Sequence, residues 1–286
     1  MTPHDLALAH GLTPIGRRPG IAAYARQLWQ RRHFIHEFAR ARHQAQYTQA
    51  KLGQLWQVAT PLLNAAVYYL VFGVLMGTKH GVPDYIPFLV TGIFVFTFTQ
   101  TSVLGGVRAV SGSIGLVRAL QFPRAALPVA LVLQQLRQLL WSLLVLAGIL
   151  LAMGGVPGPR WLLAVPALGL QLLFNTGLAL AFARLGSRVP DLAQLLPFAL
   201  RTWLYASGVM YSIADKTAGA PAAVRHALDL NPAAVYIDLV RHALIDSFGG
   251  GQVPPHAWAV AAGWAVAVGA AGFVYFWQAE ESYGRG

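Results

Sequence analysis

The chain of 286 residues is 56% hydrophobic and only 11% charged, whereas a soluble globular domain carries about 25% charged residues, so the composition predicts an integral membrane protein. Its formal net charge of +11 does not favour nucleic-acid binding, because the basic residues fall between apolar runs and not on one solvent-facing surface. The absence of cysteine excludes disulfides, thiolate metal sites and cysteine nucleophiles.

The N-terminal part of the chain is polar and basic. Residues 1–20 contain three prolines and three glycines and are predicted to be a mobile tail. In residues 21–55, arginines alternate with apolar residues spaced three, four or seven apart, namely Ile21, Tyr24, Leu28, Ile35 and Phe38. This pattern is typical of a basic amphipathic helix in the membrane interface. The alternative is a cytoplasmic helix packed on a partner protein.

Residues 56–280 are predicted to form a domain of six transmembrane helices, because a span needs about 20 predominantly apolar residues. Trp56 marks the water boundary and is predicted to be an interfacial anchor. The apolar runs are Val58–Gly77, Tyr85–Val107, Gln138–Val156 with a backward extension to Leu127, Trp161–Ala183, a run between Asp191 and Asp215 that Arg201 interrupts, and Ala257–Trp277.

The orientation follows from the lysines and arginines between these runs. Most of them fall on the side that holds both termini, and the positive-inside rule assigns that side to the cytoplasm. We therefore expect a multi-pass protein of the cytoplasmic membrane, with residues 281–286 as a cytoplasmic tail.

Two loops carry helical patterns of their own. In the inner loop, residues 108–128, a short apolar helix is predicted over Ile114, Leu116, Val117 and Leu120, and Pro123 stops it. Such an apolar surface favours a protein partner, although an interfacial helix resting on lipid fits the pattern equally well. In the outer region, residues 215–256, a helix is predicted to start at Asn231 as cap and Pro232 in the first turn, with Asp238 placed to pair with Arg241 or His242.

Catalytic motifs are absent from the sequence. The aspartates stand singly at the edges of apolar runs or in loops, and none of the three lysines follows a glycine, as the lysine of a phosphate-binding P-loop would. We therefore predict a transport subunit that is not an enzyme, with no metal or cofactor of its own.

Several motifs recur in a fixed order along the chain. They are Y-T-Q-A-K-L-G-Q-L-W-Q-V-A-T-P-L-L at Tyr47–Leu63, F-P-R at Phe122–Arg124, the turn Arg188–Asp191, and L-N-P from Leu230 with a following Arg241. Together they resemble the membrane subunit of ABC exporters of the type-2 fold, specifically the class that exports lipid-linked polysaccharides such as O-antigens and teichoic acids. The resemblance covers about residues 25–280.

This resemblance implies a homodimer that pairs with two copies of a separate ATP-binding subunit, which holds the ATP and Mg. It implies that the N-terminal helix lies at the cytoplasmic interface. The inner loop would then dock on the ATPase through Ile114, Leu116, Val117, Leu120, Phe122, Pro123 and Arg124. The outer segment would form re-entrant gate helices containing Asn231, Pro232, Asp238 and Arg241.

The predicted function is ATP-driven export of a lipid-linked cell-surface or cell-wall glycan along a path between two subunits. Aromatic rings suit a sugar path, so the candidates are Tyr68, Tyr69, Trp203, Tyr205 and Tyr211; each is alternatively a core or lipid-facing aromatic. Arg201 is predicted to contact the diphosphate of the substrate, because an arginine inside a span persists for function. The alternative functions are a type-2 exporter of drugs or ions and a polytopic transferase that acts on polyprenyl-linked sugars.

Overall fold

The computed structural model describes residues 19–47, 55–75, 77, 84–120, 122–213, 219, 221–248 and 253–283. These residues form helices and connecting turns, and no strand occurs among them. Most of the predicted N-terminal tail, residues 48–54 of the basic segment and parts of the outer region lie outside the described residues. The observed class is therefore all-α, as predicted.

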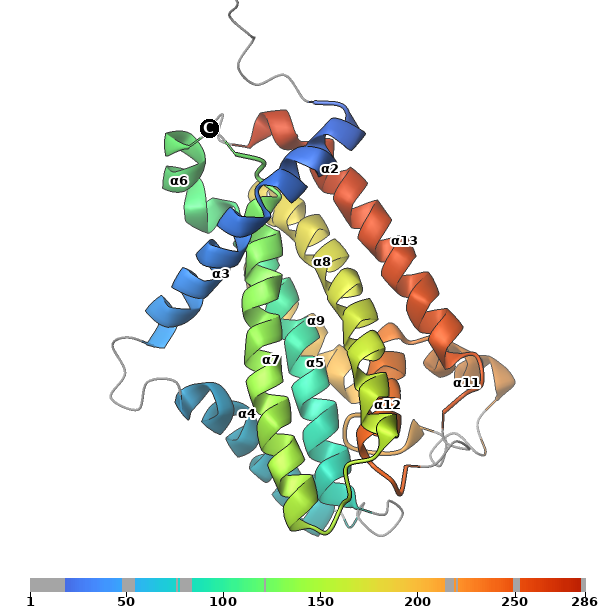
Figure 1. Cartoon of the computed structure of the whole chain (residues 1–286). Helices are drawn as coiled ribbons and strands as arrows, with labels where there is room; N and C mark the ends of the chain where they lie inside the picture. The colour runs from blue at the N-terminus through green and yellow to red at the C-terminus, as the bar shows by residue number, and fades with distance from the viewer. Residues whose placement is uncertain are drawn as a thin grey trace, which may run out of the picture.

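Four helices of the described part are long and apolar enough to cross a membrane, and they form the bundle in Figure 1. They are α5 (Tyr85–Val107), α7 (Ala126–Ala152), α8 (Ala164–Arg188), which follows the 3-10 turn η4 (Pro159–Leu163), and α13 (Ala257–Trp277). The backward extension of the third predicted run is confirmed, because α7 begins at Ala126 and contains Arg137.

The six-span count is not confirmed, because the first and fifth predicted spans form shorter helices. In the first, α4 (Leu55–Tyr68) passes into the π-helical stretch η1 (Tyr69–Leu75). In the fifth, α9 (Leu192–Ala206) has 15 residues and a length of about 22 Å, less than the hydrocarbon core of about 30 Å. It ends before Gly208, whose φ of 61° leaves the right-handed helical region.

The centre of the bundle is α5, and most of its side chains are buried. It contacts α4, α7, α8, α9 and the outer helix α12 (Pro232–Leu244). The helices α8 and α13 approach each other closely at glycines: a Cβ on Gly272 would lie 2.0 Å from the carbonyl oxygen of Gly177, and a Cβ on Gly177 would lie 2.2 Å from that of Val268. Small residues at such a crossing let backbones meet where no hydrophobic driving force exists between helices in lipid.

The short helices lie at the two ends of the bundle. At the end shown uppermost in Figure 1, α2 (Ile21–Gln30) lies near the last turn of α13, and α6 (Ile114–Ala119) lies at the same end on the opposite side of the view. From there α3 (Arg32–Tyr47) descends along α7 and packs on it through Ile35 and Ala39. The basic segment is therefore two helices with a break at Arg31. The helix α11 (Ala222–Asp229) and α12 lie in the lower half of the view.

We expect the α8–α13 contact to be sensitive to one added methyl group. Gly177→Ala should lower the thermal unfolding midpoint of the purified protein, because overpacking against rigid backbone costs about 1–3 kcal/mol. Gly263→Ala is the matched control on α13, since a Cβ there meets nothing within 4 Å and alanine is the better helix former. Equal midpoints for the two variants would contradict the close contact.

Candidate functional site

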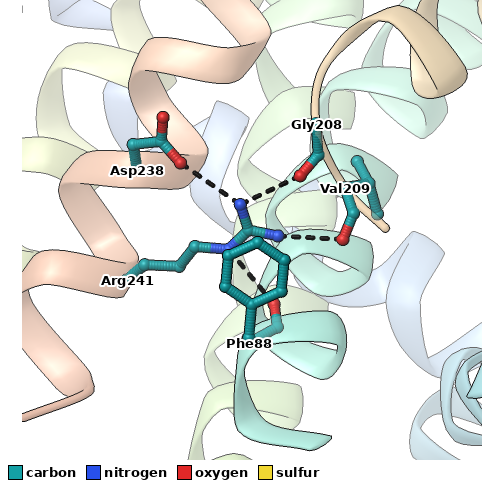
Figure 2. Close-up of polar contacts among 5 residues, drawn as sticks. All are labelled: Phe88, Gly208, Val209, Asp238 and Arg241. Carbon is teal, nitrogen blue, oxygen red and sulfur yellow. Dashed lines mark hydrogen bonds and ion pairs between the residues drawn. The ribbon is translucent and has the colours of Figure 1, made fainter. Parts of the chain in front are cut away.

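The helix α12 carries a fully buried guanidinium, that of Arg241 (Figure 2). Its Nη1 donates to the carbonyl oxygen of Gly208 at 3.0 Å and to Asp238 Oδ1 at 3.2 Å. Its Nη2 donates to Val209 at 2.9 Å, its Nε donates to the carbonyl oxygen of Phe88 at 3.1 Å, and the Phe88 ring covers the guanidinium. One side chain thus joins α12, the end of α9 and the start of α5.

This network explains how the chain after α9 is held inside protein. The last helical carbonyls of α9 and the turn beyond it need donors, and Arg241 supplies two of them. The predicted ion pair with Asp238 is confirmed. Arg241 does not face solvent, because α5 and the turn after α9 cover it.

Asn231 joins the same two elements through its side chain. Its Oδ1 accepts from the backbone N–H of Ala233 at 3.2 Å, which confirms the predicted helix cap with Pro232 in the first turn. The same oxygen accepts from Trp203 Nε1 at 2.9 Å, and Nδ2 donates to the carbonyl oxygen of Ala206 at 3.0 Å. Predicted gate and path residues are thereby brought together.

The six predicted path residues divide into two groups. Tyr69 packs on Tyr85, and Trp203 packs edge-on against Phe96, so both turn toward the bundle. Arg201 and Tyr205 are exposed on α9, whereas Tyr68 on α4 and Tyr211 beyond α9 are half-buried and also pack against the core. Tyr68 lies within electrostatic range of Tyr205 and Arg201, and the Tyr211 hydroxyl donates to the carbonyl oxygen of Tyr205 at 2.8 Å. We call Tyr68, Arg201, Tyr205 and Tyr211 the lateral surface.

Arg201 is the cation of this lateral surface. It is exposed and forms no ion pair with another residue of the described ranges. It stands about 15 Å along the helix from Asp191, the residue at which α9 is capped. The other arginine inside a predicted span, Arg137, contacts the ring nitrogens of His36 on α3 at 2.8 and 3.2 Å. Of the two, Arg201 is therefore the one with its charge available to a ligand.

The predicted coupling residues also have two different environments. Ile114 and Leu120 are exposed, Leu116 is half-buried and Val117 is buried. The motif at Phe122–Arg124 faces the protein: the Phe122 ring packs on Phe34, Pro123 is buried and Arg124 binds the C-terminal turn. Trp56, the predicted anchor, is exposed in the first turn of α4.

A second buried polar cluster escaped the sequence analysis. It joins Tyr24, Arg124 and Glu280 at the end of the bundle that carries α2 and α6. Burial raises the pKa of both Glu280 and Tyr24. The only signal in the sequence is an acidic residue directly after the last apolar run, which by itself resembles an ordinary solvent-exposed tail residue.

The comparisons with known proteins place this chain in a family. A family model described as ABC-2 type transporter matches residues 36–245, well over half of the chain. The chain therefore belongs to the ABC-2 type transporter family and is a membrane component of such a transporter.

Two curated relatives carry a more specific description. The O-antigen export system permease protein RfbA of Klebsiella pneumoniae is 26% identical over 167 residues, which cover 58% of this chain and 64% of the relative. The protein of the same name from Myxococcus xanthus is 28% identical over 188 residues, which cover 66% of this chain and 72% of the relative. The chain thus spans less than two thirds of the length of the Klebsiella relative.

Arg241 and Asp238 offer a paired test of the outer network. Arg241→Met should lower the free energy of unfolding by about 3–5 kcal/mol, because it removes the donor of three buried backbone carbonyls and of the partly exposed Asp238 carboxylate. Asp238→Asn should cost much less, since its side chain is partly exposed and Arg241 keeps its three carbonyl acceptors. Thermal unfolding of the two purified variants measures the difference, and equal losses would show that the carbonyl contacts contribute little.

Proposed function

We propose that this chain is the permease subunit of an ATP-driven exporter that moves a lipid-linked cell-surface or cell-wall glycan across the cytoplasmic membrane. In this proposal α4 with η1 and α9 complete six spans, both termini are cytoplasmic, and α11 and α12 form the re-entrant outer gate. The chain has no nucleotide site of its own and relies on two copies of a separate ATP-binding subunit, which holds ATP and Mg. The names of its curated relatives support this substrate class.

The observation that carries the proposal is the lateral surface. A lipid-facing arginine deep in a span costs at least about 2.5 kcal/mol on insertion scales, yet Arg201 is exposed on α9, within electrostatic range of Tyr68. Aromatic rings offer rigid faces on which sugars stack, and a guanidinium binds a diphosphate through paired hydrogen bonds. The combination fits a ligand with a pyrophosphate beside sugar residues.

A second copy of the chain supplies the other wall of such a path. Around the lateral surface, α4, η1 and α9 expose large apolar side chains that no described element covers: Leu63, Val67, Leu70, Leu195 and Phe198. A homodimer related by a two-fold axis would cover this face and bring two copies of Arg201 toward one path. Each apolar residue would then contact protein near the axis or lipid at the rim.

The ATPase contact is assigned to α6. Ile114 on this helix and Leu120 directly after it are exposed at the end of the bundle that we assign to the cytoplasm, where water and not lipid would surround them. Apolar residues exposed to water on a short surface helix indicate a protein partner. Val117 is excluded from the docking face because its side chain is buried.

We expect Ile114→Asp combined with Leu120→Asp to release the ATPase while the permease stays folded, because both side chains are exposed and neither supports the core. Co-purification of the two subunits from native membranes measures the loss. Val156→Asp is the matched control, since Val156 is also an exposed apolar residue but lies at the opposite end of the bundle. Retention of the ATPase by the double variant would disprove the docking assignment.

Arg201→Gln should reduce glycan export by about 10-fold or more, the loss expected when a charge-assisted hydrogen bond is removed. Arg201→Lys should restore part of it, because it keeps the charge but not the bidentate geometry. Export is measured as glycan at the cell surface, with ATPase assembly checked separately. Thr202→Val is the control, since the Thr202 hydroxyl already donates to the carbonyl oxygen of Phe198 in its own helix.

Normal export by Arg201→Gln would refute the contact with the diphosphate. ATPase activity of the wild-type complex that responds to small amphiphiles but not to glycan lipids would instead identify a drug exporter. Glycan modification without any ATPase partner would identify a transferase.

A further inference from the structure

A buried hydrogen-bonded junction lies where the chain leaves its last span. Glu280, in the 3-10 turn η5 (Glu280–Ser282), is only 8% exposed. Its Oε2 accepts from the Tyr24 hydroxyl at 2.7 Å, and its Oε1 accepts from the backbone N–H of Arg124 at 3.0 Å. The Tyr24 hydroxyl accepts from the N–H of Ala125 at 3.1 Å, and the Arg124 guanidinium donates to the carbonyl oxygen of Glu280. We call Tyr24, Arg124 and Glu280 the inner junction.

The inner junction connects three segments that are distant in the sequence. Tyr24 belongs to α2, Arg124 ends the loop that carries α6, and Glu280 follows α13. Both oxygens of one carboxylate are used, one for each of the other two segments. A movement of any one segment must therefore break these hydrogen bonds or move the other two segments with it.

The loop that carries α6 begins and ends at this junction. Ala109 and Val110, at its start, and Ala125, at its end, are buried in one apolar cluster with Tyr24 and Phe276. The helix α6 projects between these two anchored ends (Figure 1). A displacement of α6 is thus transmitted to the inner junction through both ends of the loop.

Stability alone does not account for a carboxylate at this place. Removing a charged group from water is costly, and a buried ionic group is often replaced by apolar residues without loss of stability. What a carboxylate adds is two strong, directional acceptors on one rigid group. This feature suits a mechanical connection better than it suits a core.

The connection continues from Glu280 into the bundle. The helix α13 ends three residues before Glu280 and packs on α8 through the close Gly177–Gly272 contact. Because backbone meets backbone there, α8 and α13 resist sliding past each other and respond as one body. The junction thus links α6 to the α8–α13 pair on one side and to the interfacial helix α2 on the other.

We propose that Glu280 is a positioning residue that transmits the displacement of α6 to α2 and to the α8–α13 pair during the ATPase cycle. This inference rests on the proposed function of the chain as a permease driven by a separate ATPase. The hydrogen bonds at Glu280 keep the three segments in a fixed arrangement, so that closure of the ATPase subunits moves the permease instead of bending a loose loop.

The test uses the complete complex and a probe that does not require the substrate. Trp29 is 71% exposed on α2, and in this cysteine-free chain Trp29→Cys is the single site of maleimide labelling. In the otherwise unchanged complex, the labelling rate should differ between the nucleotide-free state and the state trapped with ATP and vanadate. Glu280→Gln should remove this difference while ATPase binding and basal hydrolysis are retained, because glutamine offers only one acceptor oxygen.

Two further variants separate transmission from a purely structural role. Glu281→Gln is the matched control, with the same charge change at an adjacent exposed position, and should keep the labelling difference. Tyr24→Phe removes the hydroxyl but keeps the ring that packs on Phe273, so it should behave like Glu280→Gln. The double variant should be no worse than either single one, because the two residues act through the same hydrogen bond.

The outcomes distinguish this inference from the function on which it rests. A permease that binds no ATPase would refute the proposed function. Two outcomes with a bound, active ATPase would refute the inference alone. One is a labelling difference that persists in Glu280→Gln, and the other is no labelling difference in the complex that carries Trp29→Cys alone. If Glu280→Gln fails to assemble, Tyr24→Phe decides: a retained difference refutes transmission, and a lost difference with normal hydrolysis supports it.

Discussion

The arrangement of α5, α9 and α12 depends on one buried guanidinium, that of Arg241. Burying a cation costs several kcal/mol unless its hydrogen bonds are satisfied, and here three backbone carbonyls and a carboxylate accept from it. These carbonyls belong to irregular or terminal backbone, which is tolerated at membrane depth only inside protein. Arg241 therefore allows α9 to end before it has the length of a full span and allows α12 to pack beside it. The side chain of Asn231 connects the same two helices through further hydrogen bonds.

The two ends of the bundle are held by polar contacts and its middle by close packing. In the middle, glycines on α8 and α13 bring backbones together, as is typical where lipid removes the hydrophobic driving force between helices. At the ends, Arg241 and Glu280 each connect three segments that lie far apart in the sequence. This division lets rigid helices move as units while the connections between them determine which units move together.

The proposed function uses both ends. In that proposal, the exposed apolar residues Ile114 and Leu120 would give the ATPase a point of contact, and the inner junction would give that contact a route into the bundle. The lateral surface, with Arg201 and Tyr205 on α9 and Tyr68 on α4, lies outside the glycine-packed α8–α13 pair. A change in the angle between that pair and its neighbours would thus alter the exposure of the path without disturbing the tightest contacts.

The sequence by itself determined what depends on local pattern. It determined the membrane class from composition, four of the six predicted spans from apolar length, the start of α12 from Asn231 and Pro232, and the pair Asp238–Arg241 from its spacing. Only the tertiary structure decided that Arg241 faces inward, that Val117 is buried, that Phe122–Arg124 bind the protein, and that Glu280 meets Tyr24. The reason is that spacing places a side chain on one face of its own helix, whereas burial and hydrogen-bond partners come from segments that fold against that face from elsewhere in the chain.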